Sequence, residues 1–312
     1  MATAGVALPL VLALAGCSVT GGGGSAGNAE PRVTATPAML KTVGVTFPLD
    51  AYEATPEQTN TLNRAQGILI TQCMQRFGFA HQAVEQQVPS ASKSNARVFG
   101  LSDPDTAAQF GYRTPGMTDA PVRTNPQHEP TAAENLALSG ENEIKPGTMP
   151  QNQDEAEKSG GSSVKLNGKA VPVGGCVRES FLKLYARKAN EVDILFVFNL
   201  KGEAESKTRE DSRVRAVNER WSQCMAKAGY KVTSPLQATK ELGFSGDALS
   251  SPAAVTAARA DVRCKQEVNL IGVYYAVTTA YQRQQTEKHG ETLALAKEQL
   301  ESRLQLAASL TR

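Results

Sequence analysis

The sequence has few of the residues on which most catalytic and metal sites depend. Its 312 residues include three histidines, and aromatic residues make up only 5%. The five cysteines include no Cys-x-x-Cys pair, and no nucleotide-binding, serine-hydrolase or zinc-protease motif is present. We therefore predict no catalytic residue, no metal site and no cofactor, and a core made mainly of Leu, Val, Ala and Ile.

A large excess of charge of one sign is also lacking. Lysine and arginine number 33 against 31 aspartates and glutamates, which gives a formal net charge of +2. The basic residues are scattered: Arg209, Arg213 and Arg220 alternate with Glu210 and Glu219. This pattern is typical of a solvated helix face, and it gives no reason to expect a nucleic-acid partner.

The apolar run nearest the N-terminus, Val6–Ala15, is shorter than the roughly 20 residues that a transmembrane helix needs. It ends in Leu14-Ala15-Gly16-Cys17, which resembles a bacterial lipobox. The resemblance implies that residues 1–16 are a signal peptide and that the sulfur of Cys17 carries diacylglycerol. Met1–Gly5 lacks the usual basic residues of a leader, which leaves the true start codon open. The alternative is an ordinary secretory signal followed by a coincidental cysteine.

A glycine-rich stretch, Gly21–Ser25, follows the predicted lipidation site. Such a segment behaves as a flexible chain, so residues 17–48 are predicted to be a disordered tether. We expect the folded part of the protein to stand on the extracytoplasmic face of the cell membrane, anchored through the lipid on Cys17.

An eight-residue phrase occurs twice farther along the chain. Gln72–Phe79 and Gln223–Tyr230 both begin Gln-Cys-Met and end in a glycine followed by an aromatic residue. Each copy is typical of a helix that ends at its glycine, because glycine enters the left-handed region without strain. The cysteine of each copy is expected on the apolar face of its helix.

The other cysteines, Cys176 and Cys264, each begin a Cys-x-x-Glu phrase on a predicted helix. An even number of cysteines beyond Cys17 in an exported chain favours disulfides over metal ligation. Four cysteines allow three pairings, and the order of the phrases favours Cys73–Cys176 with Cys224–Cys264. Redox catalysis would need an exposed cysteine with a low pKa, so a structural role is the better interpretation.

Helical periodicity dominates the rest of the sequence. Thr55-Pro56 and Asp211 are typical helix starts, and Ser251-Pro252 predicts a long helix that continues to about His289. Val164–Val171 contains Asn-Gly and predicts a β-hairpin. The apolar run Val192–Leu200 fits either a buried strand or a buried helix, and its helical neighbours favour the helix.

The predicted fold class is therefore mainly α, with one or more helical domains, a small β-hairpin, long irregular loops and two disulfides. Residues 49–204 are predicted to form an N-terminal helical module with long loops. Residues 205–312 are predicted to form a C-terminal helical module that ends in a long helix. Glu141–Ser163 is polar and of low complexity, so we expect it to be mobile.

Several motifs resemble a group of actinobacterial surface lipoproteins without assigned function. Besides the lipobox and tether, the resemblance rests on Trp221-Ser222-x-Cys224-Met225-x-x-x-Gly229-Tyr230, Ala260-Asp261-Val262-x-Cys264, Tyr281-Gln282, Gly100-Leu101, Gly111-Tyr112, Leu136-Ala137-Leu138-x-Gly140 and Gly174-Gly175-Cys176. It covers most of residues 50–290. It implies a helical fold, paired cysteines and a surface location, and it brings no catalytic residues.

We interpret the protein as a non-catalytic binding or interaction module at the cell surface. Its ligand is an unknown protein, peptide or small molecule. One alternative is an envelope enzyme whose site is assembled only in three dimensions, for which His81 is the best isolated candidate. Another is the solute-binding lipoprotein of a transporter, which the lack of strand–helix alternation disfavours. Tyr274, Tyr275 and Tyr281 fit a ligand groove, although aromatic residues at this spacing more often belong to the core.

Overall fold

The computed structural model describes residues 1, 29–42, 44–81, 95, 97–115, 129–141 and 147–311. The chain divides into two units, Met1–Glu30 and Pro31–Arg312, and the account below concerns the second. In the described ranges, no helix is long and apolar enough to cross a membrane.

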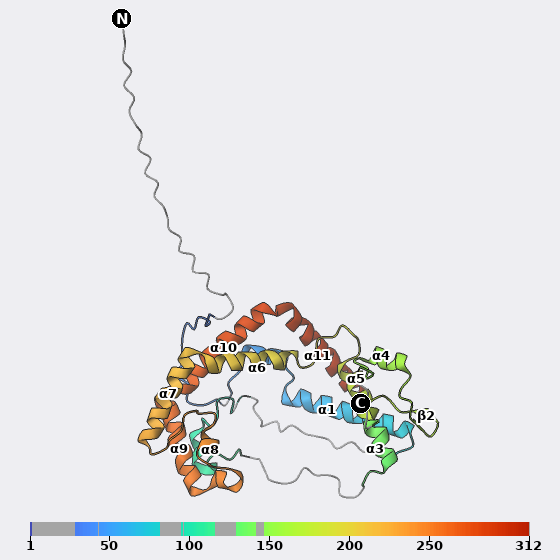
Figure 1. Cartoon of the computed structure of the whole chain (residues 1–312), viewed down its shortest axis with the longest axis horizontal. Helices are drawn as coiled ribbons and strands as arrows, with labels where there is room; N and C mark the ends of the chain where they lie inside the picture. Colours follow the sequence, from blue (N-terminus) through green and yellow to red (C-terminus); the bar gives the residue numbers. More distant parts are fainter. Residues whose placement is uncertain are drawn as a thin grey trace. The chain divides into compact units, whose positions relative to one another are not determined.

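The second unit is mainly helical, as the sequence predicts (Figure 1). Its helices are α1 (Pro56–Arg76), α2 (Pro104–Phe110), α3 (Ala132–Ser139), α4 (Gln153–Ser159), α5 (Gly175–Tyr185), α6 (Phe196–Glu210), α7 (Ser212–Lys227), α8 (Ala238–Glu241), α9 (Pro252–Glu267), α10 (Leu270–Lys288) and α11 (Gly290–Leu310), with 3-10 helices η1 (Pro48–Tyr52) and η2 (Gly246–Ser250).

The repeated phrase forms the same helix ending in α1 and α7. The N–H groups of Phe79 and Tyr230 donate to the carbonyl oxygen of the methionine five residues earlier, at 3.2 and 2.9 Å. The preceding glycines, Gly78 and Gly229, have φ angles of 85° and 89°. This is the glycine-terminated ending predicted from the sequence. The hydrogen bond from the N–H after the glycine satisfies a carbonyl oxygen in the last helical turn.

Two disulfides hold these helix ends, and they have the favoured pairing. Cys73 is joined to Cys176 with 5.6 Å between their Cα atoms, and Cys224 to Cys264 with 5.7 Å. The first bridge links the end of α1 to the start of α5, whereas the second links the ends of α7 and α9. The same phrase is therefore joined to the start of a helix in one case and to the end of a helix in the other.

The first bridge depends on a close backbone approach between α3 and α5. A Cβ atom on Gly175 would lie 2.5 Å from the carbonyl oxygen of Leu138, and one on Gly140 would lie 2.7 Å from the nitrogen of Gly175. Both distances are far too short for a side chain. The glycine next to Cys176 thus brings that cysteine to the end of α1 by letting two backbones touch.

The predicted hairpin is present as β1 (Lys165–Leu166) and β2 (Lys169–Ala170), which pair antiparallel. Asn167 and Gly168 have φ angles of 51° and 77°, as a type I′ turn requires. The side-chain amide of Asn167 donates to the carbonyl oxygen of Phe77 at 2.7 Å. The hairpin therefore helps to close the end of α1.

A buried polar cluster lies inside the packing of α7 and α9. The ammonium group of Lys265 donates to the carbonyl oxygen of Leu101 at 2.7 Å and to Asp261 at 3.1 Å. The indole N–H of Trp221 donates to the other Asp261 oxygen at 2.9 Å. Burial raises the pKa of Asp261 and lowers that of Lys265. Since these groups satisfy one another, we assign the cluster a structural role.

One sequence prediction on the C-terminal side needs correction. The long helix predicted from Ser251 to about His289 is two helices, because Asn269 adopts a left-handed φ of 52° between α9 and α10. The side chain of Asn269 accepts from the N–H of Met39 at 3.2 Å and donates to the carbonyl oxygen of Pro37 at 3.0 Å. The break thus binds a segment more than 200 residues away, which local periodicity does not reveal.

The predicted tether and the predicted mobile loop also differ from the structure. The compact unit begins at Pro31, inside the predicted tether 17–48, and Val33 and Met39 pack against the core around α10. Within Glu141–Ser163, α4 forms behind an N-cap at Asn152, whose side chain accepts from the N–H of Glu155 at 3.0 Å. In the described parts of these segments, single apolar residues and a local cap form contacts that the polar composition did not predict.

The apolar run Val192–Leu200 is helical only from Phe196 onward, and it is not fully buried. Leu200 lies in the core, but Leu195 and Phe198 are 54% and 66% exposed. The prediction of a buried element was therefore wrong for this stretch. The exposed Ile194 and Phe198 line a cavity beside α6, whereas Leu195 does not.

Candidate ligand-binding groove

The residues singled out in the sequence do not meet in one site. Cys17 lies outside the described residues, and the other four cysteines form the two bridges. Tyr274 and Tyr281 are 2% and 8% exposed and belong to the core, which confirms the core interpretation for these two. His81 is half-buried just after α1. In the described part of the chain, no group of three His, Cys, Asp or Glu side chains could hold a metal ion.

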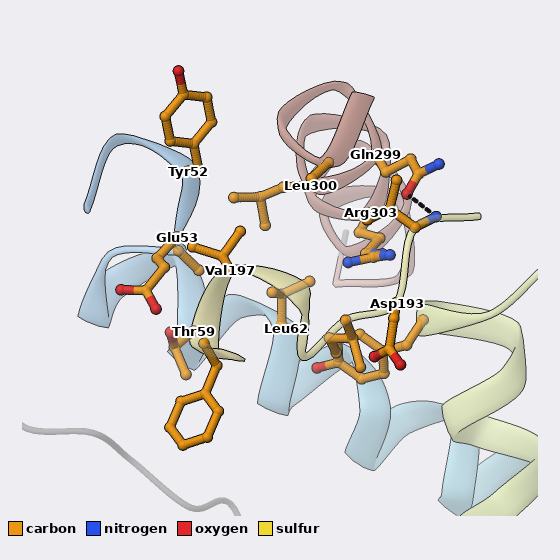
Figure 2. A pocket seen from close by; sticks show the side chains of 15 residues that line it. Tyr52, Glu53, Thr59, Leu62, Asp193, Val197, Gln299, Leu300 and Arg303 are labelled. Atoms are coloured by element: carbon orange, nitrogen blue, oxygen red, sulfur yellow. Dashed lines mark hydrogen bonds between the residues drawn. The ribbon is translucent and has the colours of Figure 1, made fainter. Parts of the chain in front are cut away.

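The structure instead forms a groove where η1, the start of α1, α6 and α11 come together (Figure 2). We call this cavity of about 380 Å³ the α6–α11 groove. This volume is at the lower end of the range of about 300–1,000 Å³ that is typical of small-molecule sites. Its lining includes Leu62, Asp193, Ile194, Val197, Phe198, Leu300 and Arg303.

Three hydrogen bonds position the loop and helix that form one wall. The N–H of Val192 donates to the side-chain oxygen of Gln299 on α11 at 3.0 Å, which ties the loop to that helix (Figure 2). The N–H of Leu195 donates to Asp193 at 2.8 Å just before α6 begins. Lys201 of α6 donates to Glu53 at 2.5 Å, beside η1. These contacts fix segments that are distant in the sequence around one opening.

Lys201 also donates to Asp50 at 2.9 Å, so one ammonium group holds two carboxylates. Burial lowers the pKa of Lys201, but its hydrogen bonds to Glu53 and Asp50 outweigh this effect and raise the pKa. The Glu53 carboxylate on the groove wall is therefore already compensated by a cation.

The groove lining mixes polar residues with apolar side chains, some of them buried on the wall and some exposed on the rim. Leu62 of α1 and Val197 of α6 are 5% and 7% exposed, whereas Ile194 and Phe198 on the rim are 41% and 66% exposed. Large apolar side chains cost free energy when they stay in water, by roughly 25 cal/mol for each Å². An apolar ligand that covered Ile194 and Phe198 would recover part of that free energy.

One buried cation, Arg303 of α11, is part of the groove lining beside these apolar side chains. Its side chain is 8% exposed, and among the described residues its Nε atom has no hydrogen-bond acceptor. The nearest carboxylate oxygen belongs to Glu191 and lies 3.9 Å from Nη2. The guanidinium also lies over the ring of Tyr185, 6.0 Å from its centroid, and burial lowers the pKa of Arg303. Figure 2 shows the guanidinium projecting from α11 toward the side of the groove where Asp193 lies.

Arg303 was missed in the sequence, although a signal for it exists. Leu293, Leu300 and Ala307 recur at helical spacing on the buried face of α11, and Arg303 lies between the last two on the same face. A charged residue within an apolar stripe is expected to have a buried partner or a function. The groove itself could not be predicted, because its walls come from four segments spread over more than 200 residues.

No family model matches this chain, and neither a curated protein nor a solved structure is significantly similar to it.

Proposed function

We propose that the protein is an exported lipoprotein, held through Cys17 on the extracytoplasmic face of the cell membrane, whose helical unit binds a ligand without catalysis. The α6–α11 groove is the proposed binding site. The observation that carries this proposal is a cavity of about 380 Å³, partly lined by apolar side chains and bordered by a rim that exposes Ile194 and Phe198.

The disulfides support the export part of the proposal. Cys73–Cys176 and Cys224–Cys264 are expected to persist in an oxidising compartment outside the cytoplasm. The lipobox-like sequence that ends at Cys17 supports anchoring through a lipid.

The chemistry of the lining supports binding over catalysis. The described residues that line the groove include no serine, cysteine, histidine or lysine, which are the usual nucleophiles and bases of hydrolases. Of its carboxylates, Glu53 is paired with Lys201, and Asp193 accepts the N–H of Leu195. The described residues contain only one two-stranded sheet, which also disfavours the α/β lobes of transporter-type solute receptors.

The anchor can be tested by cell fractionation. The wild-type protein should be in the membrane fraction, and Cys17→Ser should release it into the soluble fraction or the medium. Equal membrane retention of both forms would contradict lipidation at Cys17.

The groove can be tested with the full chain carrying Cys17→Ser and a neutral apolar dye, Nile red. We expect the dye to bind with enhanced fluorescence and Phe198→Ser to weaken binding several-fold. Leu195→Ser is the matched control, because Leu195 is similarly exposed but does not line the groove. Equal dye binding by both variants would place the apolar site elsewhere and contradict the proposal.

A further inference from the structure

We propose that the ligand of the α6–α11 groove is an aliphatic carboxylate, whose chain lies on the apolar walls and whose carboxylate pairs with Arg303. This inference rests on the proposed function of the groove and adds the chemical class of its ligand.

The charges around Arg303 leave room for one more anion. Arg303 and Arg187 share a single carboxylate, Glu191, at 3.9 and 3.6 Å. Arg187 has a further acceptor in Ser302, at 2.8 Å, whereas in the described structure Arg303 has no hydrogen bond at Nε. Two guanidinium groups with one carboxylate carry a local charge of +1. A buried cation is costly unless it is paired and hydrogen-bonded.

The other carboxylates at the groove do not pair with Arg303. Glu53 is bound to Lys201 at 2.5 Å, on the η1 side. Asp193 is exposed at the rim and accepts the N–H of Leu195 at 2.8 Å, where it fixes the start of α6. A carboxylate brought by a ligand would supply the missing acceptor, and the planar guanidinium can bind such a group through two parallel hydrogen bonds.

The rest of the surface fits an aliphatic chain. Leu300 on α11 lies one helical turn from Arg303, and Leu62 and Val197 line the same groove (Figure 2). The exposed Phe198 is also part of the lining. These side chains offer no hydrogen-bonding groups to a polar ligand. A molecule with one anionic end and an apolar body therefore matches the surface better than a sugar or a polar peptide does.

The test is isothermal titration calorimetry on the full chain carrying Cys17→Ser, at neutral pH and below the aggregation concentration of each probe. The probes are decanoate, decanol and decylamine, which share one chain and differ in their head group. Decanoate should bind at least about tenfold more tightly than decanol, because a hydrogen-bonded charge typically contributes about 1.5–3 kcal/mol. Decylamine should bind more weakly than decanol, since its cation would face Arg303.

The variants separate the head group from the chain. Arg303→Gln should weaken decanoate binding by about tenfold and leave decanol unchanged. Phe198→Ser should weaken both, and Leu195→Ser should weaken neither. If Arg303→Gln does not fold, as judged by circular dichroism, Arg303→Lys replaces it. In that case the ratio of decanoate affinity to decanol affinity in the protein with Arg303 intact decides whether the inference stands.

Each contrary outcome has a distinct meaning. Equal binding of decanoate and decanol at a site sensitive to Phe198→Ser would overturn the carboxylate inference and leave the groove standing as an apolar site. Decanoate binding that Phe198→Ser does not change would place the carboxylate elsewhere and overturn the inference. If no probe binds and Nile red does not bind either, both the inference and the proposed function fail.

Discussion

At the scale of single residues, the side chain of Asp211 makes hydrogen bonds to two helices, α7 and α10. It is the N-cap of α7 and accepts from the backbone N–H of Arg213 at 3.0 Å and from its guanidinium at 2.6 Å. It also accepts from the hydroxyl of Tyr281 on α10 at 3.3 Å. Burial raises the pKa of Asp211, but the hydrogen bonds and the charge of Arg213 outweigh burial, so that the pKa lies below its ordinary value.

This depressed pKa predicts an acid-dependent contribution to stability. Asp211→Asn keeps the cap but removes the charge, so it should lower the free energy of unfolding at pH 7 by about 1.5–3 kcal/mol. A lowered folded-state pKa gives stability that is present above the unfolded pKa of about 3.9 and is lost as pH falls through the folded pKa. The difference between wild type and Asp211→Asn should therefore shrink below about pH 4 in urea titrations.

Thr55→Ala is the matched control for Asp211→Asn. Thr55 caps α1 by accepting from the N–H of Gln58 at 3.2 Å, and neither side chain titrates. Loss of this cap in Thr55→Ala should lower the free energy of unfolding by about 1 kcal/mol at every pH. If Asp211→Asn were as stable as wild type at pH 7, the ion pair with Arg213 would contribute nothing.

At the scale of elements, the endings of α1 and α7 depend on backbone conformation alone. Gly229 has a φ of 89°, and a Cβ atom added there would have no heavy atom within 4 Å. Gly229→Ala should therefore lower the free energy of unfolding by roughly 1–2 kcal/mol through the left-handed backbone, without any steric clash. Urea unfolding of the oxidised protein measures this loss.

Gly202 provides the matched control for Gly229. It lies inside α6 and likewise has open space around its Cα atom, but its φ is not positive. Gly202→Ala should raise the free energy of unfolding by about 0.5–1 kcal/mol, because alanine favours the helix. A loss of similar size in both variants would mean that the conformation of Gly229 does not determine the ending of α7.

These elements also show which parts of the fold could be predicted. The starts of α1 and α7, their glycine endings and the turn of the hairpin depend on neighbouring residues, so the sequence predicts them. The break at Asn269 and the packing of Val33 depend on partners far along the chain, and α4 forms in a segment whose composition suggested mobility. The same limit applies to the groove, whose local signals are confined to the apolar run before Leu200 and to Arg303 within the apolar stripe of α11.

At the scale of the whole second unit, α11 connects the two predicted modules. It follows α10 in the chain, yet it packs against α1, α5 and η1 on the N-terminal side (Figure 1). Leu62 and Ala65 of α1, Leu184 of α5 and Ala307 of α11 form one buried cluster. This packing predicts that modules 49–204 and 205–312 unfold together, because α11 shares a buried cluster with α1 and α5, and α2 packs against α9.

The two bridges allow this coupling to be measured. In the chain-entropy model, a loop of 103 residues gives the Cys73–Cys176 bridge about 5 kcal/mol, and a loop of 40 residues gives the Cys224–Cys264 bridge about 4 kcal/mol. The only tryptophan, Trp221, lies in the other module from the first bridge and is fully buried. Its fluorescence therefore reports on the core cluster formed mainly by α7, α9 and α10.

We expect the double variant Cys73→Ser/Cys176→Ser to lower the urea midpoint seen by Trp221 fluorescence as much as the midpoint seen by far-ultraviolet circular dichroism. The loss of one bridge should reach Trp221 because α11 carries the packing of α1 and α5 into the rest of the unit. Cys224→Ser/Cys264→Ser is the matched comparison, and it should also move both probes together, by a slightly smaller amount. A Trp221 transition that keeps its wild-type midpoint in the first variant, while part of the helical signal is lost earlier, would mean that the modules fold independently.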